Sequence, residues 1–146
     1  METGMKWRLR SELTKNTVDS GTIVLWDVFG ELNHAYARAN AVFVGGSLAP
    51  LGGQNFLEPL IFGIRPVIGP YWDNFAWVGD DVFSQKLVIK TQDWRTASAE
   101  LIASLKYPET KETVQNAAIR YINERKGGTQ QACRLILQEL ESKKGI

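Results

Sequence analysis

Two short stretches of the sequence combine glycine with polar side chains at spacings that suit an anionic ligand. The first is the turn Phe29-Gly30-Glu31, which closely follows the apolar run at residues 23–26. Gly30 lets a ligand approach the backbone closely, and free N–H groups at the start of a following helix attract an anion. An ordinary strand-to-helix turn can have the same composition, with Glu31 stabilising the helix dipole. This turn alone therefore leaves both interpretations open.

The second stretch is the glycine- and proline-rich segment at residues 45–59. Gly46 and Ser47 can present backbone N–H groups and a hydroxyl to a phosphate. Asn55 and Glu58 are three residues apart and would share one face of a helix. A carboxylate there can accept both hydroxyls of a ribose, while the start of the helix faces the phosphate. The alternative is a glycine-rich loop with an asparagine cap and a solvated glutamate, because glycine-rich motifs alone give false positives.

The elements that must position these residues alternate between strands and helices. Apolar runs predict four strands, and helical spacing predicts five helices. The strands are expected at residues 23–26, 41–44, 66–70 and 86–89, and the helices at 31–40, 55–62, 93–105, 109–124 and 129–141. Residues 1–21 lack a strong pattern and are expected to form a poorly defined lead-in, as a loop or short helix. The alternation predicts an α/β fold with a Rossmann-like parallel sheet flanked by helices, which binds ligands at the carboxyl ends of its strands.

Composition limits the function further. The 146 residues suffice for a single domain with a hydrophobic core, and a net charge of +1 offers no strong field for nucleic acid. One cysteine and one histidine exclude an intrachain disulfide and a two-histidine metal site. No apolar run approaches the roughly 20 residues of a spanning helix. We therefore expect one soluble domain over residues 1–146, with no metal, no cofactor, no nucleic-acid partner and no transmembrane segment.

The segment from Asp27 to Phe75 closely resembles the 3-deoxy-D-manno-octulosonic acid (Kdo) transferases of lipid A biosynthesis. A looser resemblance extends from about Arg8 to the C-terminus. The matching residues are Asp27-Val28-Phe29-Gly30-Glu31-Leu32, Val44-Gly45-Gly46-Ser47, Gly52-Gly53-Gln54-Asn55-Phe56-Leu57-Glu58-Pro59, Gly63, Pro66-Val67-Ile68-Gly69-Pro70 and Asn74-Phe75.

The resemblance implies the C-terminal half of an enzyme with two Rossmann-like domains (GT-B fold). Such enzymes are inverting and metal-independent, and they move Kdo from CMP-Kdo to a lipid A precursor at the cytoplasmic face of the bacterial inner membrane. It implies that CMP is held by Phe29, Gly30 and Glu31 and by the segment Asn55-Phe56-Leu57-Glu58, with the glutamate on the ribose. Gly46 and Ser47 would line the donor site near the phosphate or the sugar carboxylate. Gln54 stands where other members often carry histidine, so its own contact with the donor is open.

Two parts of the family pattern are absent from this sequence. The family's general base is a glutamate of an N-terminal acceptor domain, and a Pro-Arg pair from an upstream strand contacts CMP; neither is present here. An inverting transfer needs that base, so we expect the chain alone to bind CMP weakly without turnover and to hold no catalytic residue. The alternatives are a GT-B transferase that uses a UDP- or GDP-sugar, and a non-catalytic nucleotide-binding module.

Overall fold

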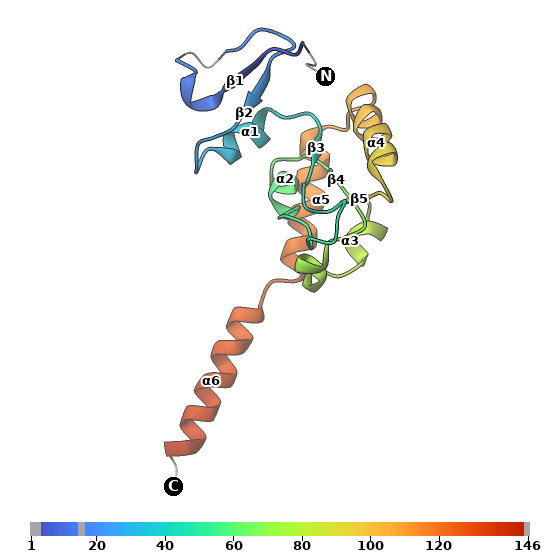
Figure 1. The fold of residues 1–146 in the computed structure, drawn as a ribbon. Helices are drawn as coiled ribbons and strands as arrows, with labels where there is room; N and C mark the ends of the chain where they lie inside the picture. Colours follow the sequence, from blue (N-terminus) through green and yellow to red (C-terminus); the bar gives the residue numbers. More distant parts are fainter. Residues whose placement is uncertain (1–3, 15–16, 145–146) are drawn as a thin grey trace. The chain divides into compact units, whose positions relative to one another are not determined.

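The computed structural model describes residues 4–14 and 17–144, and the chain divides into two compact units, Met1–Ala35 and Tyr36–Ile146 (Figure 1). The first unit holds β1 (Trp7–Leu9), the 3-10 helix η1 (Arg10–Glu12) and β2 (Ile23–Leu25), and α1 (Leu32–Arg38) crosses the boundary. The second unit holds β3 (Val42–Phe43), α2 (Leu57–Ile61), β4 (Pro66–Ile68), η2 (Asp73–Val78), α3 (Asp81–Ser84), β5 (Ile89–Lys90), α4 (Trp94–Lys106), α5 (Lys111–Glu124) and α6 (Gly128–Lys144). That residues 1–146 form a single domain stays a prediction.

The first unit contains a strand that the sequence does not predict. β1 pairs in parallel with β2, and Trp7 lies opposite Ile23. The expectation of a loop or short helix over residues 1–21 is therefore wrong at residues 7–9, because the strand is only three residues long and too short to show a periodic pattern. Ile23 and Leu25 of β2 are 42% and 48% exposed, so this apolar run does not form a buried strand.

The second unit contains a parallel three-stranded sheet in the order β3-β4-β5, packed against helices. The central strand β4 is buried at all three of its residues, as its unbroken apolar sequence requires. In Figure 1 helices flank this sheet: α4 packs on β3 and β4, and α2 packs on α5. The α/β class with parallel strands is confirmed, although the strands form two sheets rather than the one expected.

The strand β5 begins later than the sequence suggests. Lys86 has a φ of 56°, a left-handed conformation that interrupts an extended strand. The amides of Lys86 and Leu87 instead donate to the carbonyls of Phe83 and Val82, which closes the turn after α3. Leu87 and Val88 are still buried at 2% and 3% exposure. The first apolar residues of this run, Leu87 and Val88, therefore pack into the core, and the strand begins only at Ile89.

Capping residues set the start of the two long helices over the sheet. Asp93 accepts from the Thr96 amide at 2.8 Å while the Thr96 hydroxyl accepts from the Asp93 amide, a reciprocal capping box that begins α4. Thr110 begins α5 as a simple N-cap, because its hydroxyl accepts from the Thr113 amide. These two helix starts agree with the prediction to within two residues.

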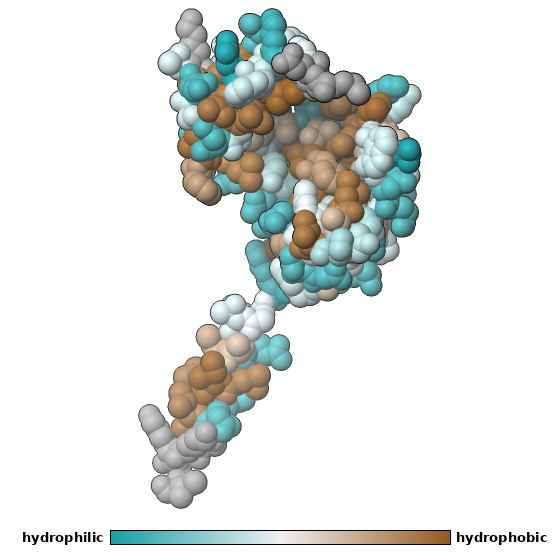
Figure 2. Space-filling view, viewed as in Figure 1, coloured by the Kyte–Doolittle hydropathy of each residue, from teal (hydrophilic) through white to brown (hydrophobic). Residues whose placement is uncertain are grey.

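The last helix, α6, presents an apolar surface that is not buried. Figure 2 shows this surface along the helix at the C-terminal end of the chain. Its exposed apolar side chains are Leu135, Ile136, Leu137 and Leu140. The predicted helix is confirmed, but its apolar stripe packs on no core within the described residues.

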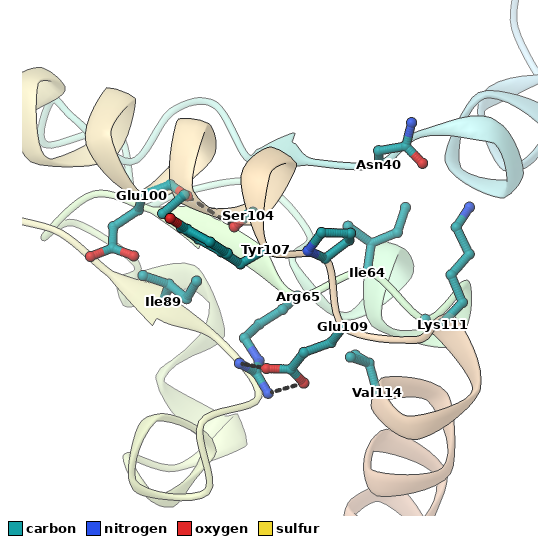
Figure 3. Close-up of a pocket in the computed structure, with 13 residues that line it drawn as sticks. Asn40, Ile64, Arg65, Ile89, Glu100, Ser104, Tyr107, Glu109, Lys111 and Val114 are labelled. Carbon is teal, nitrogen blue, oxygen red and sulfur yellow. Dashed lines mark hydrogen bonds and ion pairs between the residues drawn. The ribbon is translucent and has the colours of Figure 1, made fainter.

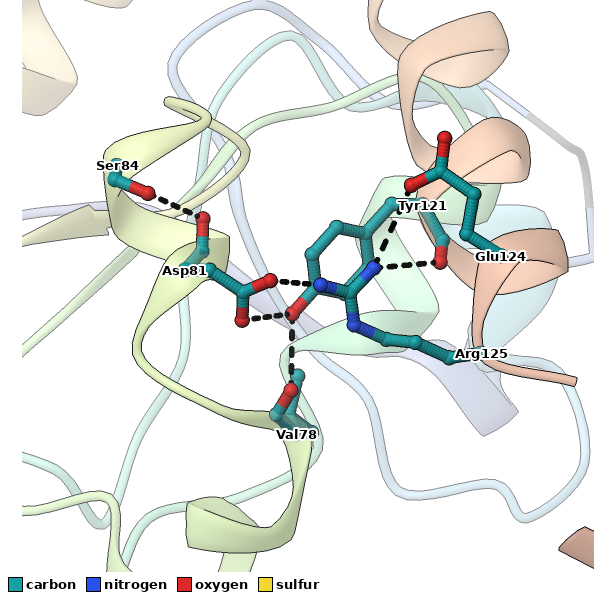
Figure 4. A network of polar contacts seen from close by, with 6 residues as sticks. All are labelled: Val78, Asp81, Ser84, Tyr121, Glu124 and Arg125. Atoms are coloured by element: carbon teal, nitrogen blue, oxygen red, sulfur yellow. Dashed lines mark hydrogen bonds and ion pairs between the residues drawn. The ribbon is translucent and has the colours of Figure 1, made fainter.

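A polar network ties the end of α5 to the segment that follows β4 (Figure 4). The buried Tyr121 hydroxyl shares its proton between the Val78 carbonyl at 2.9 Å and an Asp81 carboxylate oxygen at 3.0 Å. Arg125 pairs with the other oxygen of Asp81, and its guanidinium lies 3.6 Å from the centre of the Tyr121 ring. Burial raises the pKa of Tyr121, so its hydroxyl keeps its proton. This network fixes η2 and α3 against α5.

We predict that Tyr121→Phe destabilises the protein by about 1–2 kcal/mol, because a buried hydrogen bond to a charged group is lost. Denaturant unfolding of the purified chain measures the change. Tyr107→Phe is the matched control, since Tyr107 is 81% exposed and its substitution should change the free energy of unfolding by less than about 0.5 kcal/mol. Equal stabilities of the two variants would contradict the role given to the network.

Candidate functional site

Ser47 joins the loops that follow β3 and β4 at the carboxyl edge of the sheet. Its hydroxyl donates to the Val44 carbonyl at 2.6 Å and accepts from the Gly69 amide at 2.9 Å, and its carbonyl accepts from the Tyr71 amide at 3.0 Å. The side chain is 1% exposed. In this structure the hydroxyl is not free to meet a phosphate, because its single proton is already used and the oxygen is buried, so a contact between Ser47 and the donor stays a prediction. Ser47 therefore holds the two loops in place through buried hydrogen bonds.

The glycine-rich loop folds back on the end of β3. The Gly53 amide donates to the Gly46 carbonyl at 2.9 Å, and the Gln54 amide donates to the Gly45 carbonyl at 3.1 Å. Gly46, Gly52 and Gly53 all have positive φ, between 71° and 81°, which other residues adopt only with strain. The loop is thus a shaped structure and not a flexible linker.

Asn55 and Glu58 come together as their spacing predicts. The Asn55 amide group donates to Glu58 Oε1 at 2.9 Å, while Asn55 Oδ1 accepts from the Leu57 amide at 3.0 Å. A carboxylate offers about four acceptor positions, so the bond from Asn55 orients Glu58 and leaves capacity for the two hydroxyls of a ribose. The start of α2 does not offer the free N–H groups that the sequence suggests for a phosphate. The helix has only five residues, and the Leu57 amide already donates to Asn55.

Phe56 and Leu57 lie in the same segment but turn inward. Phe56 is 1% exposed, and its ring lies 5.3 Å from that of Phe75 and 6.3 Å from that of Trp72. Leu57 is partly buried against the same core. Their side chains therefore anchor the segment in the core, Phe56 completely and Leu57 in part.

The turn Phe29-Gly30-Glu31 belongs to the first unit, with Phe29 and Gly30 exposed and Glu31 half-buried. Phe29 is fully exposed, and Gly30 has a φ of 83°. Glu31 Oε2 lies 2.9 Å from Arg10 Nε, an ion pair without hydrogen-bond geometry. The remaining site residues, Gly46, Ser47, Gln54, Asn55, Phe56, Leu57 and Glu58, belong to the second unit.

Two residues that the sequence analysis did not single out, Arg10 and Ser11, support this turn. The Ser11 hydroxyl and amide donate to the two carboxylate oxygens of Asp27 at 2.5 and 2.9 Å, and Arg10 lies over the Trp26 ring. These hydrogen bonds hold the pKa of Asp27 below its ordinary value of 3.8. Their contribution is therefore present at neutral pH and is lost only as the pH falls through that lowered pKa. A sixteen-residue separation from Asp27 hides this contact from local sequence patterns.

Tyr36 is a further neighbour of the site in the second unit. Burial, and to a smaller extent the charge of Glu58, raises the pKa of the Tyr36 hydroxyl. Its ring lies 6.0 Å from that of Phe62, just after α2. The Tyr36 hydroxyl therefore keeps its proton at neutral pH. Tyr36 lies within the helix predicted over residues 31–40, and the sequence pattern does not single it out.

A cavity of about 260 Å³ lies at the opposite edge of the same sheet (Figure 3). It is lined by residues that precede strands, such as Asn40 and Arg65, and by the C-terminal half of α4. Arg65 is held there by a bidentate pair with Glu109 at 2.6 and 2.8 Å. Because parallel α/β sheets bind ligands at the carboxyl ends of their strands, this cavity is not the candidate site. Within the described residues, no group of three or more His, Cys, Asp or Glu side chains is arranged to hold a metal ion.

Comparisons with known proteins agree with the resemblance seen in the sequence. A 3-deoxy-D-manno-octulosonic acid transferase of Bordetella pertussis is 32% identical over 107 residues, which cover 73% of this chain and 25% of that protein. One of Haemophilus influenzae is 31% identical over 120 residues, covering 82% of this chain and 28% of that protein. The crystal structure of the C-terminal CMP-Kdo binding domain of WaaA from Acinetobacter baumannii matches with a TM-score of 0.69 and 32% identity.

The chain is a relative of the Kdo transferases. The WaaA match covers 81% of this chain and 61% of that structure, so the likeness extends to the fold as well as the sequence. The chain spans about a quarter of the length of the curated Kdo transferases it matches. No family model matches it.

We predict that Gly69→Ala destabilises this Kdo transferase relative by about 1–3 kcal/mol, the usual cost of overpacking. An added Cβ would lie 2.2 Å from the Ser47 carbonyl oxygen, so the two loops would have to separate. Gly45→Ala is the matched control, because its Cβ would meet no atom within 4 Å. Thermal unfolding of both variants measures the difference. If Gly69→Ala unfolded at the same temperature as Gly45→Ala, the close approach of the two loops would be refuted.

Proposed function

We propose that this chain is the donor-binding domain of a glycosyltransferase that moves Kdo from CMP-Kdo to a lipid A precursor in lipopolysaccharide biosynthesis. The observation that carries the proposal is the match in sequence and fold to the CMP-Kdo binding domain of WaaA. The named relatives are Kdo transferases, and no observation favours a UDP- or GDP-sugar or a non-catalytic module. The acceptor, the general base and the placement of the whole enzyme at the cytoplasmic face of the inner membrane belong to this proposal.

The site geometry supports donor binding by residues of the second unit. Glu58, oriented by Asn55, accepts the hydroxyls of the ribose, and Gln54 is exposed in the same segment of the chain. At Gly46 the donor can approach the backbone closely, because glycine has no side chain. The resemblance adds Phe29, Gly30 and Glu31 of the first unit as further contacts with CMP. Ser47, Phe56 and Leu57 act by shaping the loop that carries Asn55 and Glu58.

The chain's share of the reaction is binding and orientation. Transfer with inversion requires a base that removes the proton of the acceptor hydroxyl, and we propose that a separate part of the full enzyme supplies it. Charge alone gives no reason to expect a nucleic-acid partner. None of the helices in the described part of the chain combines the length and apolar character of a membrane-spanning segment.

We predict that Glu58→Ala weakens the binding of CMP by about 1–3 kcal/mol, the range for losing hydrogen bonds to a charged group. Calorimetric titration of CMP into the purified chain measures the change. Glu100→Ala removes the same charge at the opposite edge of the sheet and should bind CMP as the wild type does. If Glu58→Ala is folded and keeps its affinity, Glu58 is no more than a solvated glutamate.

A further inference from the structure

Three consecutive carbonyls of the glycine-rich loop converge on one residue of the neighbouring loop, Asn74. The Asn74 backbone amide donates to the Gly52 carbonyl at 3.0 Å. Its side-chain amide donates to the Gly53 carbonyl at 3.2 Å and, more weakly, to the Leu51 carbonyl at 3.4 Å. Asn74 therefore joins the two loops at a second position, beside the link that Ser47 makes.

The loop is shaped to receive this side chain. A Cβ on Gly52 would lie 2.6 Å from three atoms of the Asn74 carboxamide, so the carboxamide rests directly on the glycine backbone. A Cβ on Gly53 would lie 3.1 Å from the Tyr71 carbonyl oxygen. Since both glycines also have positive φ, larger residues here would be strained as well as crowded.

The opposite side of the same loop is held by the end of β3. The Gly53 amide donates to Gly46, while the Gly53 carbonyl accepts from Asn74. The next residues along the chain are Gln54 and Asn55, and Asn55 orients Glu58. The direction in which the chain leaves Gly53 therefore sets the position of the Asn55–Glu58 pair.

We propose that Asn74 is a positioning residue for donor binding, which clamps residues 51–53 so that Asn55 and Glu58 meet the donor correctly. The inference rests on the proposed function. Asn74 is exposed and lies outside the hydrophobic core, so its side chain adds little to global stability. The backbone N–H of Asn74 already donates to the Gly52 carbonyl. The contacts with the Leu51 and Gly53 carbonyls therefore depend on the side-chain NH₂ group, which has two protons to donate.

The test compares Asn74→Ala and Asn74→Asp with the wild-type chain. Aspartate keeps the shape of asparagine but directs a carboxylate at the loop carbonyls, so it should weaken CMP binding more than alanine does. We expect CMP affinity to fall about threefold to tenfold in Asn74→Ala, as for the loss of a hydrogen bond of about 1 kcal/mol, and further in Asn74→Asp. Asn116→Ala and Asn116→Asp are matched controls, because Asn116 is an exposed asparagine of α5.

Amide hydrogen exchange separates positioning from general stability. The Gly53 and Gln54 amides, which donate to the end of β3, should exchange several-fold faster in Asn74→Ala. The Thr91 amide, which donates to the Ile68 carbonyl at 2.8 Å in the sheet, should keep its wild-type rate. A local loosening of Gly53 and Gln54 with weakened CMP binding supports the clamp.

Three other outcomes would overturn the proposed role of Asn74. If CMP affinity is unchanged in both Asn74 variants, the clamp has no part in donor binding. If the Thr91 amide also exchanges faster, Asn74 supports the fold as a whole and is not a positioning residue. If the wild-type chain does not bind CMP although its Gly53 amide is protected, the proposed function fails first, and the donor role of Asn74 fails with it.

Discussion

The hydrogen bonds of one buried hydroxyl, that of Ser47, set the geometry of the proposed site. Ser47 joins the end of β3 to the Gly69 amide at the end of β4, while Thr91 makes the corresponding link from the end of β5 to the Ile68 carbonyl. An unpaired buried hydroxyl costs about 1–3 kcal/mol in proteins, so both side chains hold their loops in one arrangement. Gly69 permits the approach, since any side chain there would strike the Ser47 backbone.

The position of the loop after β3 depends on these hydrogen bonds of Ser47 and on further contacts along the loop. The loop after β3 is fixed at its base by Ser47, on one flank by Gly46 and on the other by Asn74. Phe56 then pins the chain into the core, which leaves Glu58 at the surface with its orientation set by Asn55. The site is thus built mainly from backbone groups, and its few side chains either orient one another or face inward.

Much of the fold could be predicted from local patterns. The buried strand β4 and the capped helix α4 carry strong signals, namely an unbroken apolar run and an Asp–Thr capping box. β1 escaped prediction because it consists of three residues whose pairing with β2 is non-local. The start of β5 was misplaced because Lys86 adopts a left-handed conformation that an apolar run does not reveal.

The local geometry of the candidate site could be predicted only in part, and its residues stay predicted donor contacts. The spacing of Asn55 and Glu58 indicated a shared face correctly, since such a pair depends only on local geometry. Ser47, Phe56 and Leu57 were assigned to the donor, yet their side chains are buried or partly buried. Burial depends on contacts between distant segments, as does the clamp by Asn74. Those roles could be seen only in three dimensions.

The proposed donor site is specific for a cytidine nucleotide. Titration of the purified wild-type chain with CMP and, separately, with UDP measures this specificity. We expect measurable binding of CMP and much weaker binding of UDP. Tight binding of UDP with none of CMP would contradict the cytidine assignment.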